Sequence, residues 1–121
     1  MRTIIGCLIA ATGLVAGCGS SFPPPTQPMA DVQAADRSAK ELGASNVPKA
    51  TLHLQYAEEQ RSQAAKLMSD GENERAAALL VRAKADAELA VALAHENKAK
   101  TEVQEVMQKT QKTTTSPGGA Q

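Results

Sequence analysis

Cysteine and aromatic side chains are scarce in this sequence of 121 residues. Both cysteines, Cys7 and Cys18, lie near the N-terminus, so the rest of the chain can form neither a disulfide nor a thiol metal site. Aromatic residues make up 2% of the chain and tryptophan is absent, while alanine supplies much of the 42% hydrophobic fraction. Burying one methyl group contributes only about 0.8 kcal/mol, which argues against a large α/β core. Alanine has the highest helix propensity, so we predict an all-α fold.

An excess of charge of one sign is also missing, since Lys plus Arg and Asp plus Glu both total 13. This balance argues against a nucleic-acid partner, which would need a basic surface. The two histidines, His53 and His95, have no metal-ligand spacing around them, so we predict no metal site. Neither a Gly-x-Ser-x-Gly elbow nor a glycine-rich phosphate loop occurs. We therefore predict no catalytic residues and no enzyme.

The N-terminus has the organisation of a secretory signal peptide. Arg2 is the only charged residue among the first 18, and small residues precede Cys18. The uncharged run between them is shorter than the ~20 residues that a membrane-spanning helix needs. We therefore expect this segment to direct export and to be removed.

Residues 14–18, Leu-Val-Ala-Gly-Cys, resemble the lipobox of bacterial lipoproteins, although Val15 stands where leucine is usual. The resemblance implies cleavage between Gly17 and Cys18, so that residues 1–17 are the signal peptide. It also implies a diacylglycerol on the Cys18 thiol and an N-linked acyl chain such as palmitate, with no other cofactor. A secreted protein that is cut elsewhere is the alternative.

Residues 18–30 are the predicted linker that begins with the lipidated cysteine. Within it, the stretch from Gly19 to Pro28 contains four prolines, which favours an extended spacer of ~3.1 Å per residue. In lipoproteins of Gram-negative bacteria, an aspartate directly after the cysteine favours retention in the inner membrane, and here that residue is Gly19. We therefore expect anchoring in the outer membrane, facing the periplasm, with the inner membrane as the alternative.

Residues 31–109 are predicted to form an antiparallel three-helix bundle with a long third helix. Asp31 is the candidate N-cap of the first helix, and Gly43 is its expected end. Pro48 suits the first position of the second helix, which Gly71 is expected to end.

Apolar spacing predicts which faces of the first two helices are buried. The expected buried residues are Val32, Ala35, Ala39 and Leu42 in the first helix, and Leu52, Tyr56, Ala57, Ala64, Leu67 and Met68 in the second. Leu54 is expected to point away from this face. In the third helix, Asp86 borders the apolar face, and we expect it to pair with Arg82 or a lysine at the bundle edge. The alternative is that Asp86 sets the register between helices.

The third helix is expected from about residue 73 to about residue 109, with a disordered tail at 110–121. It has two opposite apolar stripes, of which the first is Ala76, Leu79, Leu80, Ala83, Ala87, Ala90 and Ala94, and the second is Ala78, Val81, Ala85, Leu89, Ala92, Ala99, Val103 and Val106. A helix that is apolar on two sides is normally covered on both. After His95 only the second stripe continues, so we expect this part to project and to offer Ala99, Val103 and Val106, the partner seam, to another chain.

From Val32 to about Val106 the pattern resembles a family of short helical bacterial lipoproteins, the domain of unknown function numbered four-three-nine-eight. The residues that carry the resemblance are Ala35, Ala39, Gly43, Ala44, Pro48, Leu52, Ala57, Gly71, Ala76, Leu80, Ala83, Asp86, Ala87, Leu89 and Ala90. The resemblance implies three helices beneath a lipid anchor and no enzymatic activity. Family members often occur beside OmpA-like peptidoglycan-binding domains, which implies an OmpA-like protein as a partner.

These observations predict a lipid-anchored cell-envelope protein with a non-catalytic helical domain for structural or protein-interaction roles. The anchor would provide its contact with the membrane, and the partner would be an envelope protein or a second copy of the chain. The alternative is a periplasmic chaperone or adaptor that holds client proteins on the partner seam. A binder of small molecules or metals is a third and weaker hypothesis.

Overall fold

A computed structural model describes residues 22–115, which form three α-helices and one short 3-10 helix. The helices are α1 (Thr26–Glu41), α2 (Pro48–Ser69) and α3 (Asn73–Thr115), with η1 (Ala44–Asn46) between the first two. The described residues contain no strand, so the predicted all-α, three-helix arrangement is confirmed. The predicted signal peptide, Gly17 and Cys18 lie outside the described residues.

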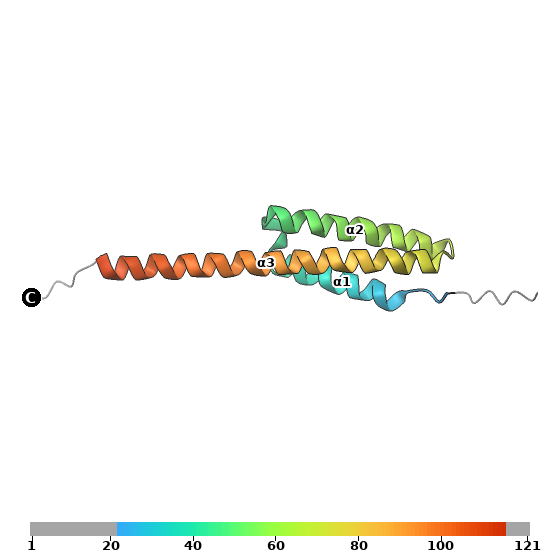
Figure 1. Cartoon of the computed structure of the whole chain (residues 1–121), viewed down its shortest axis with the longest axis horizontal. Coiled ribbons are helices and arrows are strands. Elements are labelled where there is room, and N and C mark those ends of the chain that lie inside the picture. The colour runs from blue at the N-terminus through green and yellow to red at the C-terminus, as the bar shows by residue number, and fades with distance from the viewer. Residues whose placement is uncertain (1–21, 116–121) are drawn as a thin grey trace, which may run out of the picture.

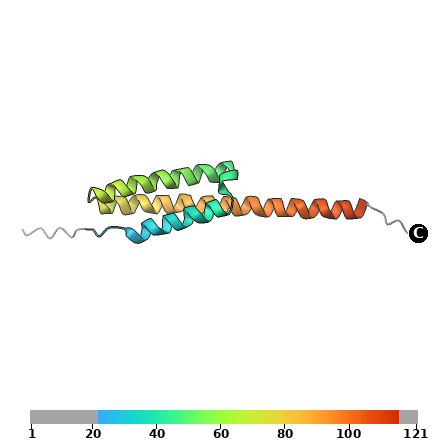
Figure 2. The same ribbon diagram turned by 180° about the vertical axis from the view of Figure 1, so that it is seen from behind.

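The helices run up, down and up, and α1 and α2 both lie along the first half of α3 (Figure 1). The second half of α3 extends alone beyond the other helices, as the view from behind also shows (Figure 2). This part was predicted to project. Because α1 and α3 run in the same direction, the start of α1 and the end of α3 lie at opposite ends of the described part of the molecule.

Two glycines end helices as the sequence predicts. Gly43 and Gly71 have φ angles of 83° and 77°, a left-handed conformation that glycine adopts without the steric cost that a Cβ atom would bring. Pro48 is the first residue of α2, where its missing N–H has no helical acceptor in any case. The turns of the bundle are therefore well specified by local sequence.

The outer ends of α1 and α3 differ from the prediction. Helix α1 begins at Thr26, five residues before Asp31, because Pro28 falls in the first turn, where a helix needs no backbone N–H. Helix α3 continues to Thr115 instead of ending near residue 109. The hydroxyl groups of Thr110, Thr113, Thr114 and Thr115 each donate a hydrogen bond to the carbonyl four residues earlier. Residues 26–30 and 110–115 are thus helical, and not linker or tail.

The core consists mainly of alanine, and the first predicted stripe of α3 lies within it. Its buried residues are Ala76, Leu80, Ala83, Ala87, Ala90 and Ala94. One cluster joins Leu80 to Val32 of α1 and Ala64 of α2, and a second joins Ala90 and Ala94 to Ala39, Ala44, Ala50 and Leu54. Small side chains allow the helix backbones to approach closely.

The predicted buried face of α2 was partly wrong. Leu54 is only 5% exposed and belongs to the core, whereas Leu52 and Tyr56 are each 44% exposed. The buried residues Ala50, Leu54, Ala57 and Ala64 follow a repeat of four and three residues, and Arg61 occupies the intervening position. The alanines therefore define the buried face of α2, and the largest apolar side chains do not.

Replacing Ala83 by leucine should lower the free energy of unfolding by about 2 kcal/mol, because Ala83 is fully buried and a larger side chain must push the helices apart. Urea unfolding followed by circular dichroism measures this change. Ala85→Leu is the matched control, since Ala85 is exposed on the same helix. Equal stability of the two variants would contradict the close packing at Ala83.

Candidate interaction surface

The second apolar stripe of α3 is exposed, which corrects the expectation that both sides of this helix would be covered. Val81 is 69% exposed and Leu89 is 42% exposed, although α1 and α2 lie beside this part of α3. The reason is that α1 and α2 both pack within one half of the circumference of α3, on the side of the buried alanines. The opposite side of α3 therefore faces solvent along its described length.

The partner seam lies on the part of α3 that extends beyond the bundle. Ala94 is the last buried residue of α3, and every residue from 95 to 115, here called the projecting segment, is exposed. Within it, Val103 is 54% exposed and Val106 is 62% exposed. Met107 lies beside them at 61% exposure and was not anticipated, although it follows Val103 by four residues, which is one helical turn.

The positions on this face alternate in spacing between three and four residues, the repeat that is typical of a coiled-coil contact. In order along α3 they are Leu89, Ala92, Glu96, Ala99, Val103, Val106, Thr110 and Thr113. The apolar content is greatest at Val103 and Val106, near the middle of the projecting segment. The geometry can hold one further helix lengthwise, and it forms no enclosed cavity.

The contact between α2 and α3 includes a polar group centred on Asp86. Its Oδ1 atom lies 2.9 Å from His53 Nδ1, and Gln60 donates a hydrogen bond of 2.7 Å from Nε2 to Oδ2. The expected pairing with Arg82 or a lysine is therefore wrong. Asp86 joins α3 to two turns of α2, which is what the register-setting alternative requires. His53 also meets Tyr56 edge to face, with 6.1 Å between ring centres, so this histidine belongs to the helix contact.

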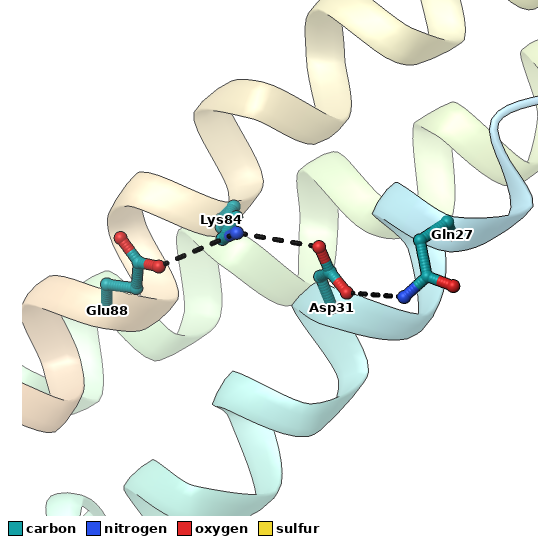
Figure 3. Close-up of polar contacts among 4 residues, drawn as sticks. All are labelled: Gln27, Asp31, Lys84 and Glu88. Carbon is teal, nitrogen blue, oxygen red and sulfur yellow. Dashed lines mark hydrogen bonds and ion pairs between the residues drawn. The ribbon is translucent and has the colours of Figure 1, made fainter.

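The contact between α1 and α3 includes Asp31, which lies inside α1 and does not cap it. Gln27 donates a hydrogen bond of 2.8 Å to Asp31 Oδ1, and Lys84 of α3 lies 3.5 Å from Oδ2 and 3.9 Å from Glu88 (Figure 3). The Gln27 hydrogen bond and, more weakly, the Lys84 charge lower the pKa of Asp31. These exposed contacts link the two parallel helices at their polar edge.

The contact between α1 and α2 contains a charged residue that the sequence analysis did not single out. Asp36 is 4% exposed between Val32 and Ala39, and Arg61 Nε lies 3.2 Å from its Oδ2 atom. The Arg61 N–H is not aligned for a hydrogen bond, so Asp36 accepts none from the described residues. Burial raises the pKa of Asp36, and the Arg61 charge opposes this effect. The signal in the sequence was its spacing from Val32 and Ala39, which places it on their face.

Two other kinds of site, a metal centre and a membrane-spanning helix, are not found within residues 22–115. No group of three or more His, Cys, Asp or Glu side chains in this range could hold a metal ion. Among the described helices, none has an apolar stretch long enough to cross a membrane. The exposed face of α3 is therefore the surface that we take as the candidate functional site.

No family model, curated protein or solved structure matches the chain. The resemblance to the domain of unknown function numbered four-three-nine-eight consequently gains no support from these comparisons and stays a prediction.

Proposed function

We propose that this chain is a lipid-anchored protein of the bacterial cell envelope, located at the periplasmic face of the outer membrane. Its three-helix domain would act as a non-catalytic interaction module that presents the projecting segment of α3 to a partner. The observation that carries the proposal is the exposed apolar face around Val103 and Val106, which lies beyond the bundle. The lipobox resemblance at Cys18 supplies the anchor.

The arrangement of the helices suits this role. Asn73, the first residue of α3, donates a hydrogen bond of 2.9 Å to the carbonyl of Phe22, which holds the start of the described chain at the start of α3. Val103 lies roughly 45 Å farther along α3, at 1.5 Å per residue. A chain anchored through Cys18, four residues before Phe22, would therefore place the partner seam roughly 45 Å along α3 from the anchored end of the bundle.

The spacing on the exposed face favours one helical partner over many unrelated clients. A repeat of three and four residues specifies knobs-into-holes contact with a single helix. A chaperone or adaptor, the alternative function, would need a surface that adapts to different chains. An OmpA-like envelope protein is the partner that the family resemblance suggests.

The anchor is tested by replacing Cys18 with serine in the full chain, expressed in a Gram-negative host. We expect an unprocessed precursor that keeps residues 1–17 and carries no acyl chain, because the lipid is attached through the cysteine thiol. Mass spectrometry of the membrane fraction measures both properties. The wild-type chain should carry several acyl chains, which together hold a protein firmly in a bilayer.

Cys7→Ser is the matched control, since only six residues precede Cys7, too few for the apolar run of a signal peptide. This variant should be cleaved and acylated like the wild type. An unacylated N-terminus on the mature wild-type protein, or normal maturation of the Cys18→Ser variant, would refute the anchor.

A further inference from the structure

We propose that the projecting segment pairs with the same segment of a second copy of this chain, in antiparallel orientation. The inference deepens the proposed function by naming the partner, and it rests on the interaction role of α3 but not on the lipid anchor. It comes from the order of charges beside the exposed apolar positions, read together with the length of the segment.

The need for a partner follows from the isolation of the projecting segment. Its residues pack against no other helix, and all of them are exposed. Helices of this length are marginal in water without tertiary contacts, since most helical stability in proteins comes from packing of an apolar face. Val103, Val106 and Met107 offer such a face, each more than half exposed. Apolar area alone does not select the partner, but the flanking charges do.

Two sets of flanking positions decide how a second copy could lie. The core positions of the repeat are Glu96, Ala99, Val103, Val106, Thr110 and Thr113. On one side they are flanked by His95, Glu102 and Lys109, and on the other by Lys100, Met107 and Thr114. In a coiled coil these flanking residues face those of the partner helix and choose its orientation.

A parallel pair fits these residues poorly. It would stack Glu96 on Glu96 of the second copy in the core, which places like charges together. Across the flanks it would bring His95 to Lys100 and Glu102 to Met107, so no opposite charges would meet. Parallel pairing is therefore disfavoured.

An antiparallel pair centred between residues 104 and 105 fits them well. Val103 then packs opposite Val106 of the second copy, and Val106 packs opposite Val103. Glu102 lies beside Lys109 of the second copy, and by symmetry this ion pair forms twice. Glu96 faces Thr113, so the like charges of the parallel pair are separated.

Other antiparallel registers are disfavoured by the same charges. Moving the centre by half a heptad toward the bundle brings Glu102 onto Glu102 and Lys100 onto Lys100 of the second copy. Moving it the other way brings Lys109 onto Lys109. The favoured register also overlaps residues 94–115 of both chains, which ends where the bundle begins at Ala94. The segment is thus complementary to itself in charge, apolar position and length.

Cysteine cross-linking in cell membranes tests the orientation, with full chains that carry Ala99→Cys or Thr110→Cys. These two positions oppose each other only in the proposed pair. We expect no disulfide-linked dimer from either variant alone and a clear dimer when both are expressed together. A dimer from either single variant would indicate parallel pairing and would overturn the proposal, as would the lack of a dimer in the mixture. The wild-type chain is the control for disulfides through Cys18.

Charge reversal tests the register. Glu102→Lys and Lys109→Glu should each reduce the yield of the mixed dimer about tenfold, because each places two like-charged pairs in the contact. The double variant Glu102→Lys, Lys109→Glu should restore the yield. Both residues are exposed and outside the bundle, so thermal unfolding of the bundle should not change. Failure of the double variant to restore the dimer would overturn the register.

A photo-cross-linking residue at Lys100, in the native envelope, separates this inference from the proposed function. A product of twice the mass of the chain supports self-pairing. A discrete product with another protein keeps the interaction role but refutes self-pairing, and a broad set of products favours the chaperone alternative and also refutes it. If no product forms at all, both the interaction role and self-pairing are refuted.

Discussion

Replacing Leu80 by alanine is expected to lower the free energy of unfolding by about 3 kcal/mol. Leu80 is the largest fully buried side chain, and it contacts the cluster in which α1, α2 and α3 meet. Its buried neighbours there are Val32, Ala64, Ala76 and Ala83, and the three alanines cannot change rotamer to fill the space that the deleted atoms leave. A small domain has only about 5–10 kcal/mol of stability in total, so this change should remove a large part of it. Urea unfolding of the full chain, followed by circular dichroism, measures the loss.

Val81→Ala is the matched control, because Val81 is the next residue of α3 and is 69% exposed. Its effect should stay within about 0.5 kcal/mol. Similar losses for the two variants would show that Leu80 is not the centre of the bundle.

Local sequence predicted the turns and the buried face of α3 because each depends on few residues. Gly43, Pro48 and Gly71 specify helix ends through backbone geometry alone. The alanines of the first α3 stripe recur with little competition from other apolar residues on that side. These features would be read correctly in any chain with the same local order.

Features that depend on how the helices pack against one another could not be predicted from local sequence. Leu52 and Tyr56 looked like core residues because they are large and apolar, yet Leu54 fills the space opposite Ala90 and Ala94. The face of α2 that becomes buried is the one whose alanines let the helix backbones approach closely. The size of the apolar side chains does not predict which face this is. The second stripe of α3 was expected to be covered for a similar reason, since sequence cannot tell whether two helices pack on one side or on both.

The partner of Asp86 illustrates the same limit for polar residues. Arg82 is its neighbour in sequence, at the spacing that supports an ion pair within one helix. The bundle instead brings His53 and Gln60 of α2 to the carboxylate, at 2.9 and 2.7 Å. Because these partners are 33 and 26 residues away in the chain, only the packed bundle identifies them.

The second large effect is expected at the buried ion pair between α1 and α2. Arg61→Ala should lower the free energy of unfolding at neutral pH by about 2–3 kcal/mol, because Asp36 would keep its charge in a site that is 4% exposed. The estimate lies below that for a fully buried pair, since the Arg61 side chain is 33% exposed. Thermal and urea unfolding measure the loss. Arg37→Ala, at an exposed position of α1, is the control and should change little.

The pH dependence of the stability loss in Arg61→Ala provides a sharper test of the Asp36–Arg61 pair than the size of the loss at neutral pH. Burial raises the pKa of Asp36 above 3.8, the Glu58 charge adds to this shift, and the Arg61 and Lys40 charges oppose it. A raised pKa means that the folded chain binds the proton more tightly than the unfolded chain does. The contribution of protonated Asp36 to stability is therefore complete below pH 3.8 and is lost as the pH rises through the raised pKa. Removing Arg61 raises this pKa further, so the deficit of Arg61→Ala should be largest at neutral pH and should shrink in acid.

Comparing the free energies of unfolding of the variants at the same pH separates the titration of Asp36 from that of the other carboxylates. Asp31, for example, has a lowered pKa and changes stability in the opposite direction, since its contribution is lost as the pH falls through that pKa. Asp31 is present in every variant, so its effect cancels in the differences. The double variant Asp36→Asn, Arg61→Ala replaces the buried charge by a neutral amide and should recover much of the stability at neutral pH. The free energy of unfolding of this double variant should differ from that of the single variant Asp36→Asn by an amount that does not vary between pH 4 and 7, since residue 36 no longer titrates. A deficit of Arg61→Ala that stays constant across this range would mean that Asp36 is not the group that Arg61 stabilises.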